Sequence, residues 1–495
     1  MNMSDYTGLK TKAVNGVAWS AIQKFAVTFL TFVSEIILAR LLMPYDFGCI
    51  EMLAIFMLLA ETLVGGGFGS ALIQKKNPTQ DDYSTIFFWN MGIAVLLYIV
   101  LYFCAPAIAR FYGIPNLRPI LRVQSLVLFV YAFNIIQASQ LNKQLRFKEI
   151  ATASVIASIV SLITTIIMAY LGCGVWSLVA KNLVLALIVS IISECYTKWK
   201  PAFTFSWTSF KELFSFGFFM LLSNLVTSFS SKIQGLLIGK IYSPTTMGYY
   251  SKASGTEGVV STTISQVMDQ VTYPLYAELQ DDMPALRATL KRLIVSLAFV
   301  VFPIVCLFIL IAKPMFVILY SEKWITSIPY FQVLCIGGFA ACLQSVNFHS
   351  ISAIGKSKVT FRWTMIKRTL GIGFVVGGLA LWGMKGILCG AVLNAWFAYF
   401  VNMGLVSKYI GYKWNRQLLD LAPIAIVTAI CFGVAFVVAY LLHLNMYLDG
   451  LVKAVIFLGL FVLWIAIAKP QAYSDLKNMI LPFLRKFKKS NVNKE

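Results

Sequence analysis

The chain has 495 residues, of which 59% are hydrophobic and only 12% are charged, against roughly 25% charged residues in soluble domains. This composition excludes a water-soluble globule and predicts an all-α polytopic membrane protein. The formal net charge of +21 comes mostly from lysine and arginine in short connections between apolar runs, so we attribute it to membrane topology and predict no nucleic-acid partner.

A helix needs about 20 apolar residues to cross a hydrocarbon core about 30 Å thick, and by this measure the chain contains about 14 transmembrane helices. The predicted spans are 14–40, 48–72, 83–108, 118–141, 150–171, 174–195, 214–241, 248–274, 290–312, 329–353, 360–382, 386–407, 421–442 and 450–468. The first apolar run is longer than the hydrophobic part of a signal peptide, so we expect that span to be retained.

Lysine and arginine alternate along the chain with these spans. If the N-terminus is cytoplasmic, the inner segments carry more than twice as many basic residues as the outer segments. The positive-inside rule therefore predicts that both termini are cytoplasmic. The basic segment after Pro470 is expected to lie on anionic lipid at the same face.

An internal repeat divides the sequence. The pattern of Ile37 to Gly48, ILARLLMPYDFG, returns two hundred positions later in Leu237 to Gly248, LIGKIYSPTTMG, and Arg40 aligns with Lys240. Weaker similarity at an offset of about 210 extends the repeat, which is typical of a transporter with two related lobes around one site. The predicted domains are an N-terminal lobe (1–196), a cytoplasmic loop (197–213), a C-terminal lobe (214–411), two further spans (412–469) and a basic tail (470–495).

Polar residues recur at steps of three or four along the first span and so share one helical face. They are Ser20, Lys24, Thr28, Thr31 and Glu35. The seventh span repeats this face with Asn224, Ser228 and Ser231, and the eighth span carries a similar series that includes Asp269. These stripes predict a polar, water-filled space between the lobes.

Five basic residues fall inside predicted spans, where an unpaired charge is expensive and marks a cavity or a partner. They are Lys24, Lys181, Lys232, Lys367 and Arg368. Adjacent residues on a helix point about 100° apart, so we expect one of Lys367 and Arg368 to face the cavity and the other a neighbouring helix. For Lys181 and Lys232, snorkelling or pairing within the bundle is the structural alternative.

Intramembrane carboxylates are fewer than intramembrane cations. Glu35 and Asp269 are candidates for ion coupling, although a structural ion pair with Arg40 or Lys24 is an equally good interpretation of Glu35. Glu51, Glu61 and Glu257 also fall in spans. We interpret the glycines between residues 65 and 69 as helix-packing positions and Asp81 and Asp82 as solvated charges beside lysines.

The sequence carries no recognisable catalytic constellation. It has no GxxxxGK phosphate-binding loop, none of the nine cysteines forms a CxxC pair, and there are only two histidines. We therefore predict no cofactor, no metal site, no catalytic residue and no enzymatic activity.

Several strings resemble the Wzx-type polysaccharide flippases of the MOP exporter superfamily, in the branch of the colanic acid and teichuronic acid exporters. They are LARLLMPYDFG (38–48), GFGSALIQ (67–74), GVWSLVA (174–180) and LLIGKIYSPTTMGYYSKA (236–253). The resemblance implies a bacterial inner-membrane flippase that moves undecaprenyl-diphosphate-linked oligosaccharide units to the periplasmic leaflet by alternating access through a cationic cavity. It also implies a functional association with a glycan polymerase and a chain-length regulator.

One position departs from the family pattern. Relatives often carry an Asn-x-Asp-like string just before the LIG of the seventh span, whereas this sequence has Lys232, Ile233 and Gln234. The missing carboxylate weakens any ion-coupling role at that position, and a lysine there favours an anionic ligand.

The resulting hypothesis is a lipid-linked oligosaccharide flippase. We expect Lys24, Lys367 and Arg368 nearest the head group and Arg40 and Lys240 at the outer mouth, with the remaining binding candidates being Lys181, Lys232 and Asn224. The alternatives are a MATE-like antiporter of drugs or small cations and a membrane glycan polymerase or ligase.

Overall fold

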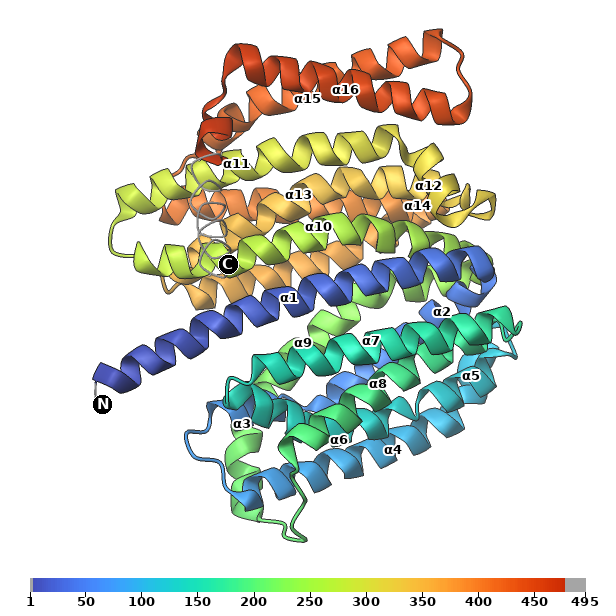
Figure 1. The fold of residues 1–495 in the computed structure, drawn as a ribbon, viewed down its shortest axis with the longest axis vertical. Coiled ribbons are helices and arrows are strands. Elements are labelled where there is room, and N and C mark those ends of the chain that lie inside the picture. The colour runs from blue at the N-terminus through green and yellow to red at the C-terminus, as the bar shows by residue number, and fades with distance from the viewer. Residues whose placement is uncertain (1–2, 477–495) are drawn as a thin grey trace, which may run out of the picture. The chain divides into compact units, whose positions relative to one another are not determined.

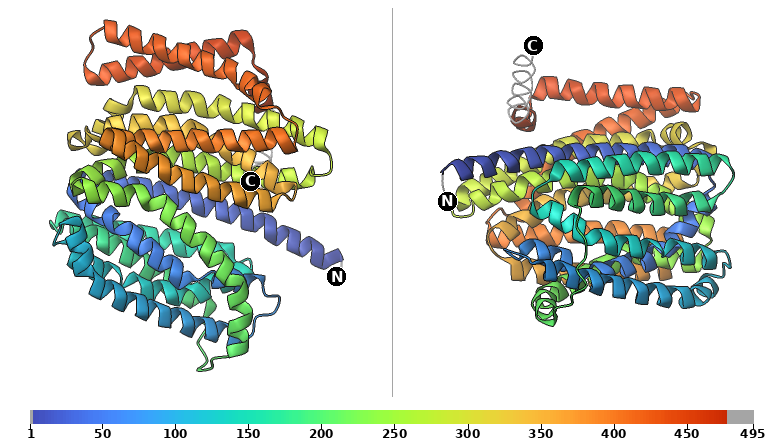
Figure 2. Two further views of the ribbon diagram at one scale, coloured as in Figure 1. Left: turned by 180° about the vertical axis from the view of Figure 1, so that it is seen from behind. Right: turned by 60° about the horizontal axis from the view of Figure 1, so that its bottom comes forward.

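The computed structural model describes residues 3–476, and every regular element in that range is a helix (Figures 1 and 2). The chain divides into two compact units, Met1–Ser251 and Lys252–Glu495, which we call the first and the second unit. The division falls inside α10 (Pro244–Glu278). The two lobes inferred from the sequence repeat have different boundaries and stay a prediction.

The first unit contains nine complete helices among the described residues. They are α1 (Met3–Leu41), α2 (Pro44–Gly65), α3 (Phe68–Gln74), α4 (Gln80–Tyr112), α5 (Leu117–Gln124), α6 (Val127–Lys143), α7 (Phe147–Tyr170), α8 (Val175–Thr197) and α9 (Trp207–Ile241). Helix α7 packs between α1 and α8, and α9 packs against α2 and α4.

The second unit contains the rest of α10 and the helices that follow it. They are α11 (Met283–Leu310), α12 (Ala312–Tyr320), the short 3-10 helix η1 (Glu322–Trp324), α13 (Ser327–Ala353), α14 (Ser357–Tyr409), α15 (Trp414–Leu441) and α16 (Met446–Ala468). Helix α14 packs on α13, α13 on α11, and the antiparallel pair α15 and α16 on α11 (Figure 1).

The described residues contain 11 helices that are long and apolar enough to cross a membrane, or 12 if the bent α9 is counted as one span. Helix α14 supplies two predicted spans, because Trp382 and Gly383 have non-helical backbone angles and divide it into two arms. Helix α10, which covers another predicted span, is more polar than these 11. The multi-pass helical fold is therefore confirmed, and the number 14 remains an expectation.

The predicted helix hairpin and its repeat are both observed in the first unit. Helix α1 ends at Leu41 and α2 begins at Pro44; α9 ends at Ile241 and α10 begins at Pro244. Proline is favoured at the first helical position because its missing N–H has no helical partner there. The equivalent glycines approach each other's turns, since a Cβ on Gly48 would collide with the Pro244 carbonyl and one on Gly248 with the Pro44 carbonyl.

Glycines also break the helix after α2. Gly66 and Gly67 have φ of +54° and +74°, a region that L-residues with a side chain rarely adopt. A Cβ on Gly67 would in addition collide with the Gly217 carbonyl in α9. The sequence prediction of close packing is correct at Gly67, and the break between α2 and α3 is a second role that it did not include.

Candidate functional site

The second unit encloses a cavity of about 590 Å³ between α13 and the two arms of α14, and we call it the cationic cavity. Its polar lining residues are Ser265, Gln344, Ser345, His349, Thr364, Lys367, Arg368 and Asn394. Among these described residues there is no carboxylate. The cavity therefore combines positive charge with hydroxyl and amide groups.

Lys367 is the most enclosed charge in this cavity, with 7% of its surface exposed. Its Nζ donates a hydrogen bond to Oδ1 of Asn402 at 2.7 Å and lies 5.7 Å from the centre of the Phe348 ring. Asn402 in turn donates to the Gln344 carbonyl at 3.4 Å. These partners fix the ammonium group without neutralising its charge.

Arg368 lines the same cavity beside Lys367. Both neighbours therefore line this cavity, although the sequence analysis expected only one of them to face a cavity and the other a neighbouring helix, and the Lys367 ammonium also contacts Asn402 in the facing arm of α14. Nε of Arg368 and Oδ1 of Asn394 are buried without a hydrogen-bond partner among the described residues. A donor and an acceptor are thus both available to a polar ligand.

The first unit encloses a cavity of about 560 Å³ with a different chemistry, and we call it the acidic cavity. It lies among α2, α5, α6, α8 and α9, and its polar lining residues are Glu51, Glu61, Gln124, Tyr131, Asn134, Asn182 and Lys232. Two carboxylates therefore share one enclosed space with a single cation.

Lys232 and Glu51 form an ion pair that joins α9 to α2 across this cavity. Glu61 has no ion-pair partner among the described residues. The side-chain oxygens Oε1 of Gln124 and Oδ1 of Asn134 are buried there without a hydrogen bond within the described part of the chain. The oxygens of Glu61, Gln124 and Asn134 that have no such partner are hydrogen-bond acceptors, and acceptor oxygens can bind a proton or a small cation.

Lys181 and Glu35 are paired with each other outside both cavities. Nζ of Lys181 lies 2.8 Å from Oε1 of Glu35, which ties α8 to α1. Of the two interpretations of Glu35, the structural ion pair is therefore observed, with Lys181 as a partner that the sequence analysis did not name. The ammonium group of Lys181 is engaged by this carboxylate.

None of the other described residues predicted from the sequence is among the lining residues of either cavity. Lys24 and Asn224 are exposed on α1 and α9, and Arg40 and Lys240 are exposed in the last turns of the same two helices. Lys240 donates a hydrogen bond to the Phe111 carbonyl. The side chain of Asp269 is outside the described residues, so its predicted coupling role is untested.

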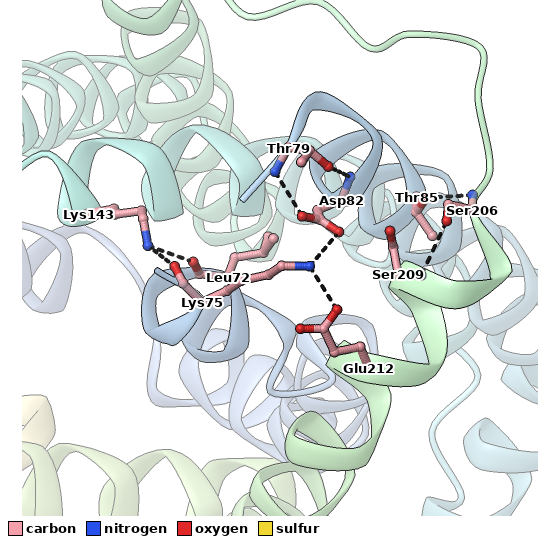
Figure 3. Close-up of polar contacts among 9 residues, drawn as sticks. All are labelled: Leu72, Lys75, Thr79, Asp82, Thr85, Lys143, Ser206, Ser209 and Glu212. Atoms are coloured by element: carbon pink, nitrogen blue, oxygen red, sulfur yellow. Dashed lines mark hydrogen bonds and ion pairs between the residues drawn. The ribbon is translucent and has the colours of Figure 1, made fainter. Parts of the chain in front are cut away.

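A charged cluster holds α3, α4 and α9 together at one end of the first unit (Figure 3). Nζ of Lys75 lies 3.0 Å from Oδ1 of Asp82 and 2.9 Å from Oε2 of Glu212. Asp82 also accepts the Thr79 backbone N–H at 2.8 Å as part of the N-terminal cap of α4. Asp82 is 1% exposed, so the interpretation of this residue as a solvated charge is wrong.

The cluster changes the protonation of Lys75. Burial tends to lower the pKa of Lys75, but the hydrogen bonds and charges of Glu212 and Asp82 outweigh it, so the pKa rises above its usual value. The lysine is therefore firmly cationic and acts as a structural tie.

Several cavity residues were not predicted as site residues. Gln344, His349 and Asn394 in the cationic cavity and Glu61 and Asn134 in the acidic cavity belong to this group. Each is a polar residue inside an apolar run, and that signal could have identified them. The described residues contain no group of three or more His, Cys, Asp or Glu side chains that could hold a metal ion.

The fold is that of a multi-pass helical membrane protein with a solved structural counterpart. The solved structure of the lipid II flippase MurJ in an inward closed conformation superimposes with a TM-score of 0.71 at 16% sequence identity, covering 92% of this chain and 100% of that one. At this level of identity the likeness shows a shared fold.

The sequence comparisons identify the family. The polysaccharide biosynthesis protein family matches residues 37–329, and the chain belongs to it. Teichuronic acid biosynthesis protein TuaB of Bacillus subtilis (strain 168) is 25% identical over 406 residues, 81% of each chain. Lipopolysaccharide biosynthesis protein WzxC of Escherichia coli (strain K12) is 22% identical over 419 residues, 83% of this chain and 85% of its own. The resemblance to polysaccharide flippases is thus confirmed.

Proposed function

We propose that this protein moves undecaprenyl-diphosphate-linked oligosaccharide units from the cytoplasmic to the periplasmic leaflet of a bacterial inner membrane by alternating access. The observation that carries the proposal is the cationic cavity, where Lys367 and Arg368 lie inside the candidate span Lys358–Tyr409 without an ion-pair partner among the described residues. The relatives' roles in teichuronic acid and lipopolysaccharide biosynthesis and the fold shared with a lipid II flippase support it.

The chemistry of the cavity fits this cargo. Moving an isolated ionised group through hydrocarbon costs on the order of tens of kcal/mol unless other groups replace its water. Lys367 and Arg368 can neutralise a diphosphate, while the hydroxyl and amide groups beside them can replace water around sugar hydroxyls. Two cations also bind a diphosphate more weakly than a closed phosphate cage does, and transport requires release of the cargo.

The test is glycan export with Lys367→Gln and with Arg368→Gln in a strain that lacks its own flippase. Surface glycan is measured at matched protein levels in the membrane. We expect each variant to lose most of its export and the double variant to lose nearly all. Lys385→Gln is the matched control, because this exposed lysine lies on the same helix and does not line the cavity. Normal export by the double variant would refute the assignment of the site.

The acidic cavity supports an ion-driven version of this cycle. Because Glu35 is paired with Lys181 and Glu51 with Lys232, Glu61 is the carboxylate best suited to bind and release a proton or sodium ion. Export followed as a function of external pH and sodium in wild type and Glu61→Gln tests this proposal. Loss of the ion dependence in the variant is the expected result.

The same cavity favours a second candidate function, the MATE-like antiporter, because carboxylates bind cations. Uptake of a lipophilic cation by vesicles that contain the purified protein, driven by a proton gradient and abolished by Glu61→Gln, would support the antiporter and count against the flippase. A purified protein that lengthens or transfers lipid-linked glycan without partners would instead establish the polymerase or ligase.

The proposed cycle delivers its product to later steps of assembly, so we retain the functional association with a glycan polymerase and a chain-length regulator. The distribution of lysine and arginine supports the predicted orientation, with both termini cytoplasmic. Fusion of a reporter that is active only in the cytoplasm to the C-terminus should give an active reporter.

A further inference from the structure

The second unit contains another pocket, of about 530 Å³, at the junction of two helix ends. It is lined by the first turns of α11, by the connection that follows α14 and by the first turns of α15. Its charged lining residues are Arg287, Lys291, Lys413, Arg416 and Asp420, so four basic residues share it with one acidic residue. None of them lines the cationic or the acidic cavity.

The single carboxylate is fully used within the pocket. Oδ1 of Asp420 accepts a hydrogen bond from Nζ of Lys291 at 2.8 Å, and Oδ2 accepts one from the Tyr412 hydroxyl at 2.6 Å. One ammonium group is therefore neutralised, and the carboxylate is not available to the other basic residues.

Arg287 is held in place without being neutralised. Its Nε and Nη2 donate to the Ile410 carbonyl at 3.1 Å and 2.9 Å, so this edge of the guanidinium is fixed by a neutral acceptor. Lys413 and Arg416 are exposed and have no ion-pair partner among the described residues. Three positive groups thus converge on the pocket without an ion-pair partner of their own among the described residues, an arrangement that fits an anion with several oxygen atoms.

The surroundings of the pocket point to a lipid. Trp414, at the start of α15, is 56% exposed, and Leu419, one turn further on, is 69% exposed. Helix α15 is itself a candidate membrane span. Tryptophan is enriched at membrane interfaces, and exposed leucine on a spanning helix faces acyl chains. An anionic group in this pocket would therefore have an apolar helix surface directly beside it.

The sequence predicts on which side of the membrane this pocket lies. The connection before α11 and the connection before α15 were both assigned to the cytoplasmic face by the distribution of lysine and arginine, and the structure brings these two connections together. Basic pockets between membrane helices on the cytoplasmic side are a recognised mode of binding lipid head groups.

We propose that this pocket binds the phosphate of an anionic phospholipid in the cytoplasmic leaflet. Arg287, Lys413 and Arg416 contact the phosphate oxygens, and the acyl chains lie along the exposed start of α15. Asp420 and Tyr412 act as positioning residues, because they hold Lys291 and the connection that carries Lys413.

The experiment uses the full-length protein purified in a mild detergent. Bound lipid is counted by native mass spectrometry after titration with phosphatidylglycerol, with phosphatidylethanolamine, with undecaprenyl diphosphate or with inorganic phosphate. We expect wild type to retain phosphatidylglycerol in preference to the other three. In Lys413→Glu/Arg416→Glu its affinity should fall about tenfold or more, since each basic group near an anionic head group contributes severalfold.

The matched control is Lys358→Glu/Arg362→Glu, which makes the same change of charge at two exposed residues of α14 outside the pocket. It should retain phosphatidylglycerol as wild type does. If the glutamate variant fails to fold, Lys413→Gln/Arg416→Gln gives the same comparison with a smaller loss. Equal loss in the pocket variant and the control, or tighter binding of undecaprenyl diphosphate or inorganic phosphate than of phosphatidylglycerol, would overturn the proposal.

Discussion

The acidic cavity of the first unit and the cationic cavity of the second unit are similar in volume and opposite in charge. Lys232 and Glu51 form an ion pair in the acidic cavity, whereas Lys367 and Arg368 have no ion-pair partner among the described residues of the cationic cavity. A paired cation stabilises helix packing, and an unpaired cation retains its affinity for a ligand. The position of a basic residue in an apolar run therefore does not by itself indicate a binding site. A binding role also requires that no carboxylate is paired with the basic residue.

Under the proposed function, anion binding belongs to the second unit and cation binding to the first. In the acidic cavity the group left over after pairing is the carboxylate Glu61. Cargo and coupling ion would then bind in separate places, and a change of charge in one cavity should affect a different property from the same change in the other.

The largest effect is expected from reversing the charge in the cationic cavity with Lys367→Glu. Because the side chain is 7% exposed, the new carboxylate would be buried and would repel a diphosphate. We expect surface glycan export to fall about a hundredfold or more, since placing a like charge at a buried charge contact costs several kcal/mol.

Two further measurements separate this effect from misfolding. Membrane levels and the thermal unfolding midpoint of Lys367→Glu are compared with those of Lys367→Met, which removes the charge and keeps the side-chain length. Export by Lys367→Glu above the level of Lys367→Met would contradict an anionic cargo in this cavity.

A smaller effect, on the stability of the protein, is expected when the ion pair in the acidic cavity is removed. Lys232→Ala leaves Glu51 without its partner, and Glu51→Ala leaves Lys232 without its own, so each single variant should unfold at a lower temperature than wild type. The double variant should lose less than the sum of the two, with a coupling free energy of about 1 kcal/mol.

The control cycle uses the ion pair between Arg146, the N-cap residue of α7, and Glu149 in the first turn of that helix. Its coupling should be about 0.5 kcal/mol, because ion pairs between groups three residues apart at a helix end contribute little. Strict additivity at Lys232 and Glu51 would mean that this pair does not stabilise the first unit.

The contrast between the two cavities also shows what the sequence could predict. Apolar length predicts the positions of most spans. Charges inside apolar runs single out Lys367 and Arg368, which line a cavity in the structure, and the sequence repeat predicts the duplicated hairpin. The ion-pair partners of the other lysines could not be predicted from the sequence. Lys181 and Glu35, for example, are separated by 146 residues and meet only through the rotation and packing of two helices. The polar stripe on the first span likewise could not show what its residues face, because that depends on helix packing. Lys24, which belongs to this stripe, lines neither cavity.

Glu61→Gln tests the assignment of cation binding to the first unit. The amide keeps the shape of the side chain but cannot ionise, so export should lose its dependence on the proton or sodium gradient. We expect a severalfold loss at the pH where wild type is fastest and nearly equal rates where wild type is slowest. Glu257→Gln, in the second unit and outside the two cavities, is the control and should keep the wild-type ion dependence.

The smallest effect concerns Lys75, the structural tie of the first unit. Its raised pKa means that the folded state binds the proton more tightly than the unfolded state, so the stabilisation is fully present below the unfolded value of about 10.4 and is lost as the pH rises through the higher folded value. Glu212→Gln removes one of the two carboxylates around this lysine, and because Glu212 is 60% exposed we expect a loss of only about 0.5 kcal/mol at neutral pH. The difference in thermal midpoint between wild type and Glu212→Gln should then shrink between pH 9 and 11.5, whereas Lys76→Gln, at an exposed neighbouring lysine, should follow wild type over the whole range. A difference that stays constant with pH would mean that Glu212 stabilises the first unit through contacts other than its charge on Lys75.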